Sequence, residues 1–451
     1  MKKIISMFSA SVLLCGSFTF TTNAREEAPE QMRDITTMEL VRDMGIGINL
    51  GNTFDACGDW IAEWGDGSVQ SYETAWGSPV ITKDIIQGYA DEGFGVLRIP
   101  TAWSNMMVQD GTYTINPQWM ERITEIVDWT LDTGMYAIVN IHWDNGWVNT
   151  FPDNKDECMK RFEIMWTQIS GNFKNYGDRL MFEAQNEEFG WDSVWNKWAG
   201  NDGKPESYQL VNEINQKFVD TVRKNGGNND KRHLLISGYN TGIDVTCDPL
   251  FKMPYDPVGR CAISVHYYTP PGFAILEEDA DWGKAISTWG TEADYNELNT
   301  NLDMMKTNFI DKGIPVIIGE YGCPIKNKEP ESVRRFLSSV CEAAYKRQMC
   351  PVLWDTPGGH YDREETHQLN DRELRELFRK ICDKPVKPLK ITGDVNSDGE
   401  LSTADLVMLQ KWLLSSEPLT DSSAADMNKD GKVNIYDMVF MRKELLNKKI
   451  L

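Results

Sequence analysis

Residues 315–322 read PVIIGEYG, a short run of mostly β-branched residues that leads directly into a carboxylate. A continuous apolar run of this length is typical of a strand buried on both faces of a parallel sheet. Seven other runs along the chain have the same character. The predicted strands are 45–50, 95–99, 136–141, 180–184, 233–237, 262–267, 315–319 and 351–354.

Longer amphipathic stretches separate these runs. Apolar residues recur three and four apart in 117–131, 158–173, 208–222, 295–310 and 331–345, which predicts helices. Eight strands alternating with helices over about 350 residues predict an α/β protein with a (β/α)8 TIM barrel. A doubly wound open sheet is the alternative, but no Gly-rich phosphate-binding turn follows any of the runs.

Polar side chains gather where the predicted strands end. They are Asn49, Asn52, Arg98, His142, Asn186, Glu187, Tyr239, Asn240, His266, Tyr268, Glu320 and Trp354. In a barrel the carboxyl ends of all strands open onto one mouth, where functional side chains are found. We therefore expect these residues to surround a single cleft.

Glu187 and Glu320 suggest a chemistry for this cleft. Cleavage of a glycosidic bond needs one carboxyl group that protonates the leaving oxygen and a second that meets the developing oxocarbenium carbon. The alternative is that each glutamate is only a strand-end carboxylate neutralised by Arg98 or His142. The pair alone does not decide between the two interpretations.

Longer strings add weight to the first interpretation. The strings are GINLGNTFD (47–55), ETAWGSP (73–79), LRIP (97–100), IVNIH (138–142), FEAQNE (182–187), VHYY (265–268), VIIGEYG (316–322) and LWD (353–355). On these strings the chain, from about residue 36 to residue 381, resembles glycoside hydrolase family 5, whose members include retaining endo-β-1,4-glucanases. The first two strings are most similar to the subfamily of broad-specificity cellulases, xyloglucanases and mixed-linkage glucanases.

The resemblance implies roles for individual residues. Glu187 would be the general acid/base and Glu320 the nucleophile, at the separation of about 5–5.5 Å that retention requires. Glu187 would then need a raised pKa while Glu320 stays ionised. The supporting residues would be Arg98 and Tyr268 around Glu320, Asn186 at the sugar 2-hydroxyl, His142 and His266 along the cleft, and the aromatic residues Trp354 and Trp76 under the sugars. No cofactor would be needed in the active site.

The ends and the charge of the chain bear on location. Residues 1–24, with Lys2, Lys3 and an apolar run up to a Thr-Asn-Ala site, predict a cleaved signal peptide. A membrane anchor is the alternative, but the run is too short and is interrupted by serines and Gly16. The 68 acidic residues outnumber the 46 basic ones, for a net charge of -22. This charge argues against nucleic acid or anionic membranes as partners.

A repeat occupies the C-terminal end, where residues 394–405 read DVNSDGELSTAD and residues 426–437 read DMNKDGKVNIYD. Oxygen ligands at loop positions one, three, five and twelve, with Gly at six, are typical of calcium loops. The first ion would be bound by Asp394, Asn396, Asp398, Asp405 and the Glu400 carbonyl, and the second by Asp426, Asn428, Asp430, Asp437 and the Lys432 carbonyl.

Each loop is followed by one apolar helix, 406–414 and 438–446, and no helix of an ordinary EF-hand precedes it. These features resemble type I dockerins, small all-α calcium-binding modules that bind cohesin modules of a cellulosome scaffold. The resemblance implies two structural calcium ions and a cohesin partner. Thr403 and Ala404 in the first repeat correspond to Ile435 and Tyr436 in the second. We expect one dominant docking orientation because these contact pairs differ.

The sequence thus predicts a signal peptide (1–24), a catalytic barrel (25–383), a linker with two prolines (384–391) and a dockerin (392–451). The predicted protein is a secreted, cellulosome-borne, retaining endo-β-1,4-glucanase with a monomeric barrel and a β-glucan substrate. One alternative is a catalytically silent barrel that binds polysaccharide. Another is a metal-dependent hydrolase, which would need clustered histidines, whereas the five histidines of this sequence are scattered. Eight cysteines follow the leader, and their pairing cannot be deduced from the sequence.

Overall fold

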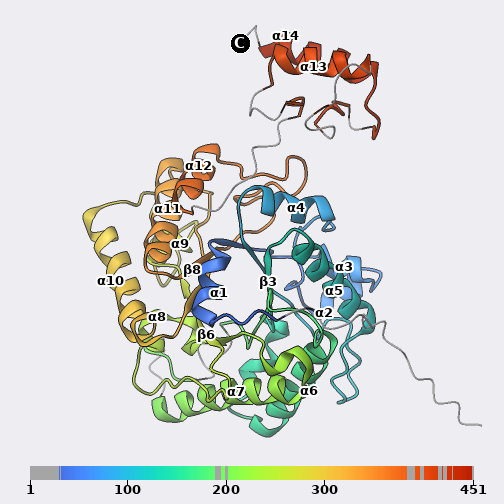
Figure 1. Ribbon diagram of the computed structural model, residues 1–451. Helices are drawn as coiled ribbons and strands as arrows, with labels where there is room; N and C mark the ends of the chain where they lie inside the picture. Colours follow the sequence, from blue (N-terminus) through green and yellow to red (C-terminus); the bar gives the residue numbers. More distant parts are fainter. Residues whose placement is uncertain are drawn as a thin grey trace, which may run out of the picture.

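The computed structural model describes residues 30, 32–187, 194–198, 202–382, 392–396, 401–414, 419, 424–428 and 430–448. The predicted signal peptide and linker lie outside these residues. The eight predicted strands form a closed parallel barrel in sequence order (Figure 1). They are β1 (Gly47–Asn49), β2 (Val96–Ile99), β3 (Tyr136–Asn140), β4 (Leu180–Glu183), β5 (Leu234–Ser237), β6 (Cys261–Tyr267), β7 (Val316–Tyr321) and β8 (Cys350–Leu353). The barrel is confirmed, and the open sheet is wrong because β1 pairs with both β2 and β8.

Helices surround the barrel. They are α1 (Thr37–Met44), α2 (Asp59–Trp64), α3 (Val69–Glu73), α4 (Lys83–Asp91), α5 (Pro117–Asp132), α6 (Lys155–Asn172), α7 (Lys204–Lys224), α8 (Ile243–Thr246), α9 (Pro271–Ala274), α10 (Glu292–Asn308), α11 (Pro330–Lys346) and α12 (Arg372–Ile381). Short 3-10 helices lie at Asp144–Thr150, Gly227–Asp230, Tyr239–Thr241 and Ile310–Lys312. The long helices begin at sequence signals. Asn116 caps α5 ahead of a proline at its first turn, and Thr291 forms a capping box on α10.

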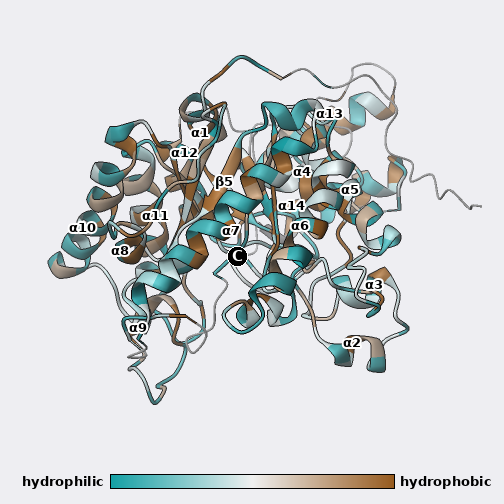
Figure 2. Ribbon diagram, turned by 90° about the horizontal axis from the view of Figure 1, so that it is seen from below, coloured by the Kyte–Doolittle hydropathy of each residue, from teal (hydrophilic) through white to brown (hydrophobic). Residues whose placement is uncertain are grey.

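The two ends of the barrel differ. Helix α1 lies across the N-terminal end, where Leu40, Val41 and Met44 pack on the inward side chains of the strands. Figure 2 shows α1 at one end of the molecule, whereas α2, α3 and α9, which follow the carboxyl ends of strands, lie at the other. Burial of the N-terminal end leaves only the carboxyl ends open for a site.

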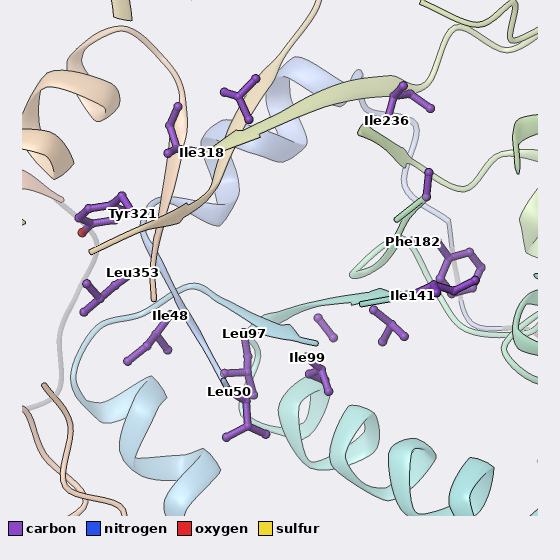
Figure 3. Packing of buried hydrophobic residues seen from close by; sticks show 14 of the residues in the cluster. Ile48, Leu50, Leu97, Ile99, Ile141, Phe182, Ile236, Ile318, Tyr321 and Leu353 are labelled. Atoms are coloured by element: carbon purple, nitrogen blue, oxygen red, sulfur yellow. The ribbon is translucent and has the colours of Figure 1, made fainter. Parts of the chain in front are cut away.

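Alternation along the strands produces two layers inside the barrel. Outward residues such as Leu97, Phe182 and Leu353 pack against the helices (Figure 3). The first inward layer is mostly apolar and includes Val96, Met181 and Ile317. The next inward layer is polar. Its buried side chains are Asn49, Arg98, Asn140, Glu183, Ser264 and Glu320.

Strand β7 carries an irregularity that decides where Glu320 points. Val265 pairs with Ile318 but His266 pairs with Glu320, so Gly319 is an extra residue in β7. Strict alternation from Ile318, which faces outward (Figure 3), would turn Glu320 outward as well. The bulge returns Glu320 to the interior. A Cβ on residue 319 would lie 2.8 Å from Ser264 Oγ and 3.1 Å from His266 Nε2, so this close approach favours glycine.

The C-terminal repeat forms a separate small unit with helices α13 (Thr403–Leu413) and α14 (Ile435–Lys448). Its core contains the buried residues Val395, Leu401, Leu409, Ala425 and Met441. Both predicted helices are present, and each begins a few residues earlier than the apolar pattern indicated. The eight cysteines of the barrel are free thiols. Within the described ranges, no helix has the length and apolar character needed to cross a membrane.

Candidate active site

Glu320 is 5% exposed and accepts hydrogen bonds at both of its oxygens. Arg98 Nη1 donates to Oε1 over 2.8 Å, and the Tyr268 hydroxyl donates to Oε2 over 2.9 Å. Burial raises the pKa of Glu320, while the charges of His266 and Arg98 oppose the rise. Because both oxygens act as acceptors, this arrangement fits an ionised carboxylate at neutral pH.

Glu187 follows β4 and stands at the mouth, with 46% of its side chain exposed. Its Oε1 lies 2.5 Å from His266 Nδ1, so a proton on either group can form a hydrogen bond to the other. One carboxylate oxygen from each glutamate and one His266 ring nitrogen all lie within 4.8 Å of one another. The two carboxylates therefore face the same small space from different strands.

The ionisation of this pair differs from the expectation that Glu187 has a raised pKa. Loss of water contacts would raise the pKa of Glu187, but the hydrogen bond and charge of His266 lower it. Burial likewise would lower the pKa of His266, yet the charge of Glu320 and the contact with Glu187 raise it. These opposite shifts favour the proton on the imidazole over the carboxyl group.

Arg98 connects the groups beneath the mouth. Besides Glu320, its guanidinium donates to Glu183, Asn49 and Asn186, at 2.7, 3.0 and 2.8 Å. Burial would lower the pKa of Arg98, but the charges of Glu183 and Glu320 outweigh it and raise the pKa. Arg98 is thus a permanent cation that fixes Asn186 directly beside Glu187.

Two cavities meet at Glu187. One, of about 630 Å³, is lined by Glu320, Tyr268, Asn186, His142 and Trp354. The other, of about 580 Å³, is lined by Glu187 together with His266, Tyr239, Trp195 and Trp198. A polymer chain crossing the mouth would thus meet Glu320 in the first cavity and extend past Glu187 into the second.

Trp354 lines the first cavity in a fixed orientation. Its ring stacks on His142 at 5.8 Å between centroids and an angle of 7°. A Cβ on residue 51 would lie 2.8 Å from the same ring, so Gly51 lets the backbone pass close behind the indole. Burial and the charge of Arg98 lower the pKa of His142 well below its usual value, so its ring is neutral.

Most of the predicted site residues come together here. Arg98, His142, Asn186, Glu187, His266, Tyr268, Glu320 and Trp354 all lie at the mouth or directly beneath it. Trp76 is half-buried in the segment after α3, and among the described residues it lines neither of the two cavities. Its contact with substrate remains a prediction without geometric support.

Sequence reasoning missed three side chains of the buried polar layer and one wall of the second cavity. Glu183, Asn140 and Ser264 lie inside predicted apolar strands, where period-two alternation could have identified them as inward polar residues. Trp195 and Trp198 lie in the loop after β4, which carries no periodic signal. A tryptophan-rich loop directly after Glu187 was the available signal for this wall.

In the C-terminal unit the second loop is described almost completely. Asp437 is fully buried, and its carboxylate accepts from the backbone N–H groups of Met427, Asn428 and Asn434. Asp426 accepts from the backbone N–H of Gly431 over 2.8 Å. In the first loop the buried Asp405 accepts from Asn396 and Ser402 in the same way, while Asp398 and Glu400 lie outside the described residues. A carboxylate and amide oxygen set of this kind fits calcium.

Two carboxylates that face one space at the mouth of a (β/α)8 barrel form the arrangement that a glycoside hydrolase requires. Residues 55–357, more than half of the chain, match the family described as Cellulase (glycosyl hydrolase family 5), and the chain belongs to this family. Residues 392–446 match the type I dockerin domain. Both predicted families are thereby confirmed, and type I dockerins are calcium-binding modules.

The chain is similar to named relatives over most of the barrel. It is 37% identical to the xyloglucan-specific endo-beta-1,4-glucanase BoGH5A of Bacteroides ovatus, over 72% of this chain and 66% of that protein. It is 32% identical to the cellulase/esterase CelE of Acetivibrio thermocellus, over 92% of this chain and 53% of that protein. The chain thus spans between about half and two thirds of the length of these relatives.

A solved structure has the same barrel. It is a broad-specificity endoglucanase of the GH5-4 group from an uncultured bovine rumen ciliate. The two share 38% sequence identity and a TM-score of 0.69, over 77% of this chain and 98% of that one.

Proposed function

We propose that this protein is a retaining endo-β-1,4-glucanase that hydrolyses plant cell-wall β-glucans by double displacement. The observation that carries the proposal is the pair formed by Glu187 and Glu320, with oxygens within 4.8 Å of each other where two cavities meet. This separation suits attack by one carboxylate and is shorter than the about 6.5–9.5 Å between the carboxyl groups of an inverting enzyme.

In the first step Glu320 attacks the anomeric carbon, and the bond from that carbon to the leaving oxygen breaks. Arg98 and Tyr268 orient Glu320 through its two oxygens, and Asn186 meets the 2-hydroxyl of the same sugar. Trp354 supports the apolar face of that sugar from the first cavity. The product of this step is a glycosyl ester on Glu320.

The leaving oxygen takes its proton from Glu187. Before substrate binds, this proton lies toward His266, as the pKa directions indicate. A sugar in the second cavity covers the half-exposed Glu187 and removes water, which favours its neutral form and draws the proton across the short contact. In the second step Glu187 takes a proton from water, which attacks the anomeric carbon and releases Glu320.

The substrate class follows from the relatives. Their names describe a xyloglucan-specific endoglucanase, a cellulase/esterase and a broad-specificity endoglucanase, and the two cavities that share Glu187 suit an internal bond of a long chain. The silent-barrel alternative is disfavoured because both carboxylates are paired with donors in a reactive arrangement. The metal-dependent alternative is disfavoured because Arg98 and Tyr268 already occupy the two oxygens of Glu320.

We further propose the domain division 25–383, 384–391 and 392–451 after a signal peptide of residues 1–24. The dockerin would bind two calcium ions, through the two ligand sets named above, and attach the enzyme to a cohesin. Its match, together with the predicted leader, supports an exported protein that works on a cellulosome.

The test compares Glu320→Gln and Glu187→Ala on soluble β-glucan and on an aryl cellobioside with a strongly acidic phenol as leaving group. Glu320→Gln should lose turnover on both substrates by roughly 10⁴-fold or more. Glu187→Ala should lose turnover on the glucan but retain formation of the glycosyl ester from the aryl substrate, since this leaving group needs no proton. Glu342→Gln, on the exposed face of α11 and in the wall of neither cavity, is the matched control. Near wild-type turnover in Glu320→Gln would rule out the assignment.

A further inference from the structure

Glu183 is a fully buried carboxylate one layer below the two glutamates of the mouth. Its Oε2 accepts from Arg98 Nε over 2.7 Å and from Asn140 Nδ2 over 3.0 Å. Its Oε1 accepts from the Ser264 hydroxyl over 2.7 Å. Three strands, β2, β3 and β6, thus supply donors to one side chain of β4. Neither cavity is lined by Glu183, so it does not touch substrate.

The contact with Arg98 is the one with consequences for chemistry. A guanidinium is a rigid planar fork, so fixing its Nε edge also fixes the direction of both terminal nitrogens. These nitrogens hold Glu320 and Asn186, at 2.8 Å each. Glu183 therefore determines how the two groups nearest the anomeric carbon are placed, without contacting the sugar.

Charge gives Glu183 a second effect. Arg98 carries one positive charge and forms ion pairs with two carboxylates, at 2.7 Å to Glu183 and 2.8 Å to Glu320. A carboxylate that is strongly stabilised by a cation is a weaker base and a weaker nucleophile. Sharing Arg98 with Glu183 leaves Glu320 oriented but less stabilised than it would be as sole partner.

We propose that Glu183 is a positioning residue for the reaction, which orients Arg98 and withholds part of its charge from Glu320. This inference rests on the proposed function, in which Glu320 is the nucleophile. Glu183 differs from a structural buried acid in one respect: its removal should change the ionisation of a group that it does not touch.

The ionisable and charged groups facing Glu320 are Arg98 from β2, His142 after β3, Glu187 after β4, and His266 and Tyr268 from β6 and its end. A Glu183→Gln substitution changes none of them and keeps nearly the same shape. With the negative charge of Glu183 removed, Arg98 stabilises the Glu320 carboxylate more strongly, and the pKa of Glu320 should fall.

The experiment measures kcat/KM against pH for full-length Glu183→Gln on soluble β-glucan. We expect the acid limb to move to lower pH by roughly one unit and kcat to fall on the order of tenfold or more. Ser264→Ala, which removes a donor to the same carboxylate but no charge, is the matched control and should leave the acid limb in place. An unmoved acid limb in Glu183→Gln, or one shifted to higher pH, would overturn the proposal.

Should Glu183→Gln fail to fold, Glu183→Asp provides the second test, because it keeps the charge and shortens the reach to Arg98. Its kcat should fall with the acid limb unchanged, whereas wild-type kcat would overturn the proposal. The variant Glu320→Gln distinguishes failure of the proposed function from failure of this inference. If the proposed function is wrong, Glu320→Gln is active; if only this inference is wrong, Glu320→Gln is inactive.

Discussion

His266 Nδ1 lies 2.5 Å from Glu187 Oε1 and 3.6 Å from Glu320 Oε2, so one imidazole faces both carboxylates. The two negative charges stabilise the protonated ring, which raises the pKa of His266. The same ring lowers the pKa of Glu187. On the proposed function, His266 would therefore hold the proton that the leaving group needs, at a pH where a lone glutamate would have lost it.

The first prediction concerns the basic limb of the pH profile. Because the pKa of His266 is raised above that of an ordinary histidine, the wild-type His266–Glu187 pair keeps its proton to a higher pH than a free imidazole would. In His266→Asn only Glu187 holds a proton, and carboxylates titrate below that pH. The basic limb of kcat/KM should then move to lower pH by roughly one unit or more.

His142→Asn is the control for this measurement. The pKa of His142 is already well below its usual value, so its ring is neutral across the working range. Its substitution should lower activity without moving the basic limb. A basic limb that stays at its wild-type position in His266→Asn would contradict the role of His266 in holding the proton for Glu187.

The second prediction concerns Trp354. Its ring is held against His142 and Gly51, and it presents a fixed apolar surface to the first cavity. Burying an aromatic ring against a sugar stabilises the complex by about 1.5–3 kcal/mol, which corresponds to roughly ten- to hundredfold in rate. Trp354→Ala should lose this factor in kcat/KM on β-glucan, and Trp354→Phe should lose less. Equal losses in both variants would show that the ring does not contact the sugar.

The strands were predictable because their signal is local. Apolar runs place all eight to within about two residues, and the polar residues at their ends identify the mouth. The direction of Glu320 was not predictable, since alternation from Ile318 points it outward and only the extra residue Gly319 reverses it. The predicted strand 315–319 ends two residues before β7 does, because β7 continues past the extra residue to Tyr321.

Other omissions have a different cause. Glu183 occupies an inward position of an otherwise apolar strand, and its partners Arg98 and Ser264 are far away in the sequence. Nothing local indicates that a buried acid is paired, because the pairing exists only after the barrel closes. The loop wall with Trp195 and Trp198 was missed for a similar reason, since loops lack a period.

The third prediction concerns removal of calcium. The second loop carries three carboxylates within twelve residues, those of Asp426, Asp430 and the fully buried Asp437. Without a cation their repulsion and desolvation are uncompensated, and a core that has five buried apolar residues in the described part of this unit is too small to offset them. A chelator should therefore unfold residues 392–448 and leave the barrel folded.

Hydrogen exchange on the full chain checks this outcome, with the barrel strands as the internal control. Amides of α13 and α14 should lose protection in chelator and regain it on addition of calcium, while hydrolysis of soluble β-glucan stays within about twofold. The Asp437→Ala variant should behave like the chelated protein around its own loop. Protection of α14 that survives chelation would contradict a calcium-dependent fold.

The last prediction concerns the orientation of docking. The first turn of α14 exposes Ile435 and Tyr436, at 54% and 65%, and Val439 continues the same face at 57%. The corresponding positions of α13 are the smaller Thr403 and Ala404. Large apolar and aromatic side chains supply most of the affinity of protein interfaces, so the face of α14 should bind cohesin and that of α13 should not.

Calorimetry with a cohesin should show a loss of roughly a hundredfold or more for Ile435→Ser with Tyr436→Ser. The matched variant, Thr403→Asp with Ala404→Asp, should change the affinity by less than about threefold, since surface substitutions outside an interface have small effects. Similar affinities for the two double variants would mean that either repeat can dock, and that the difference between these contact pairs has no bearing on orientation.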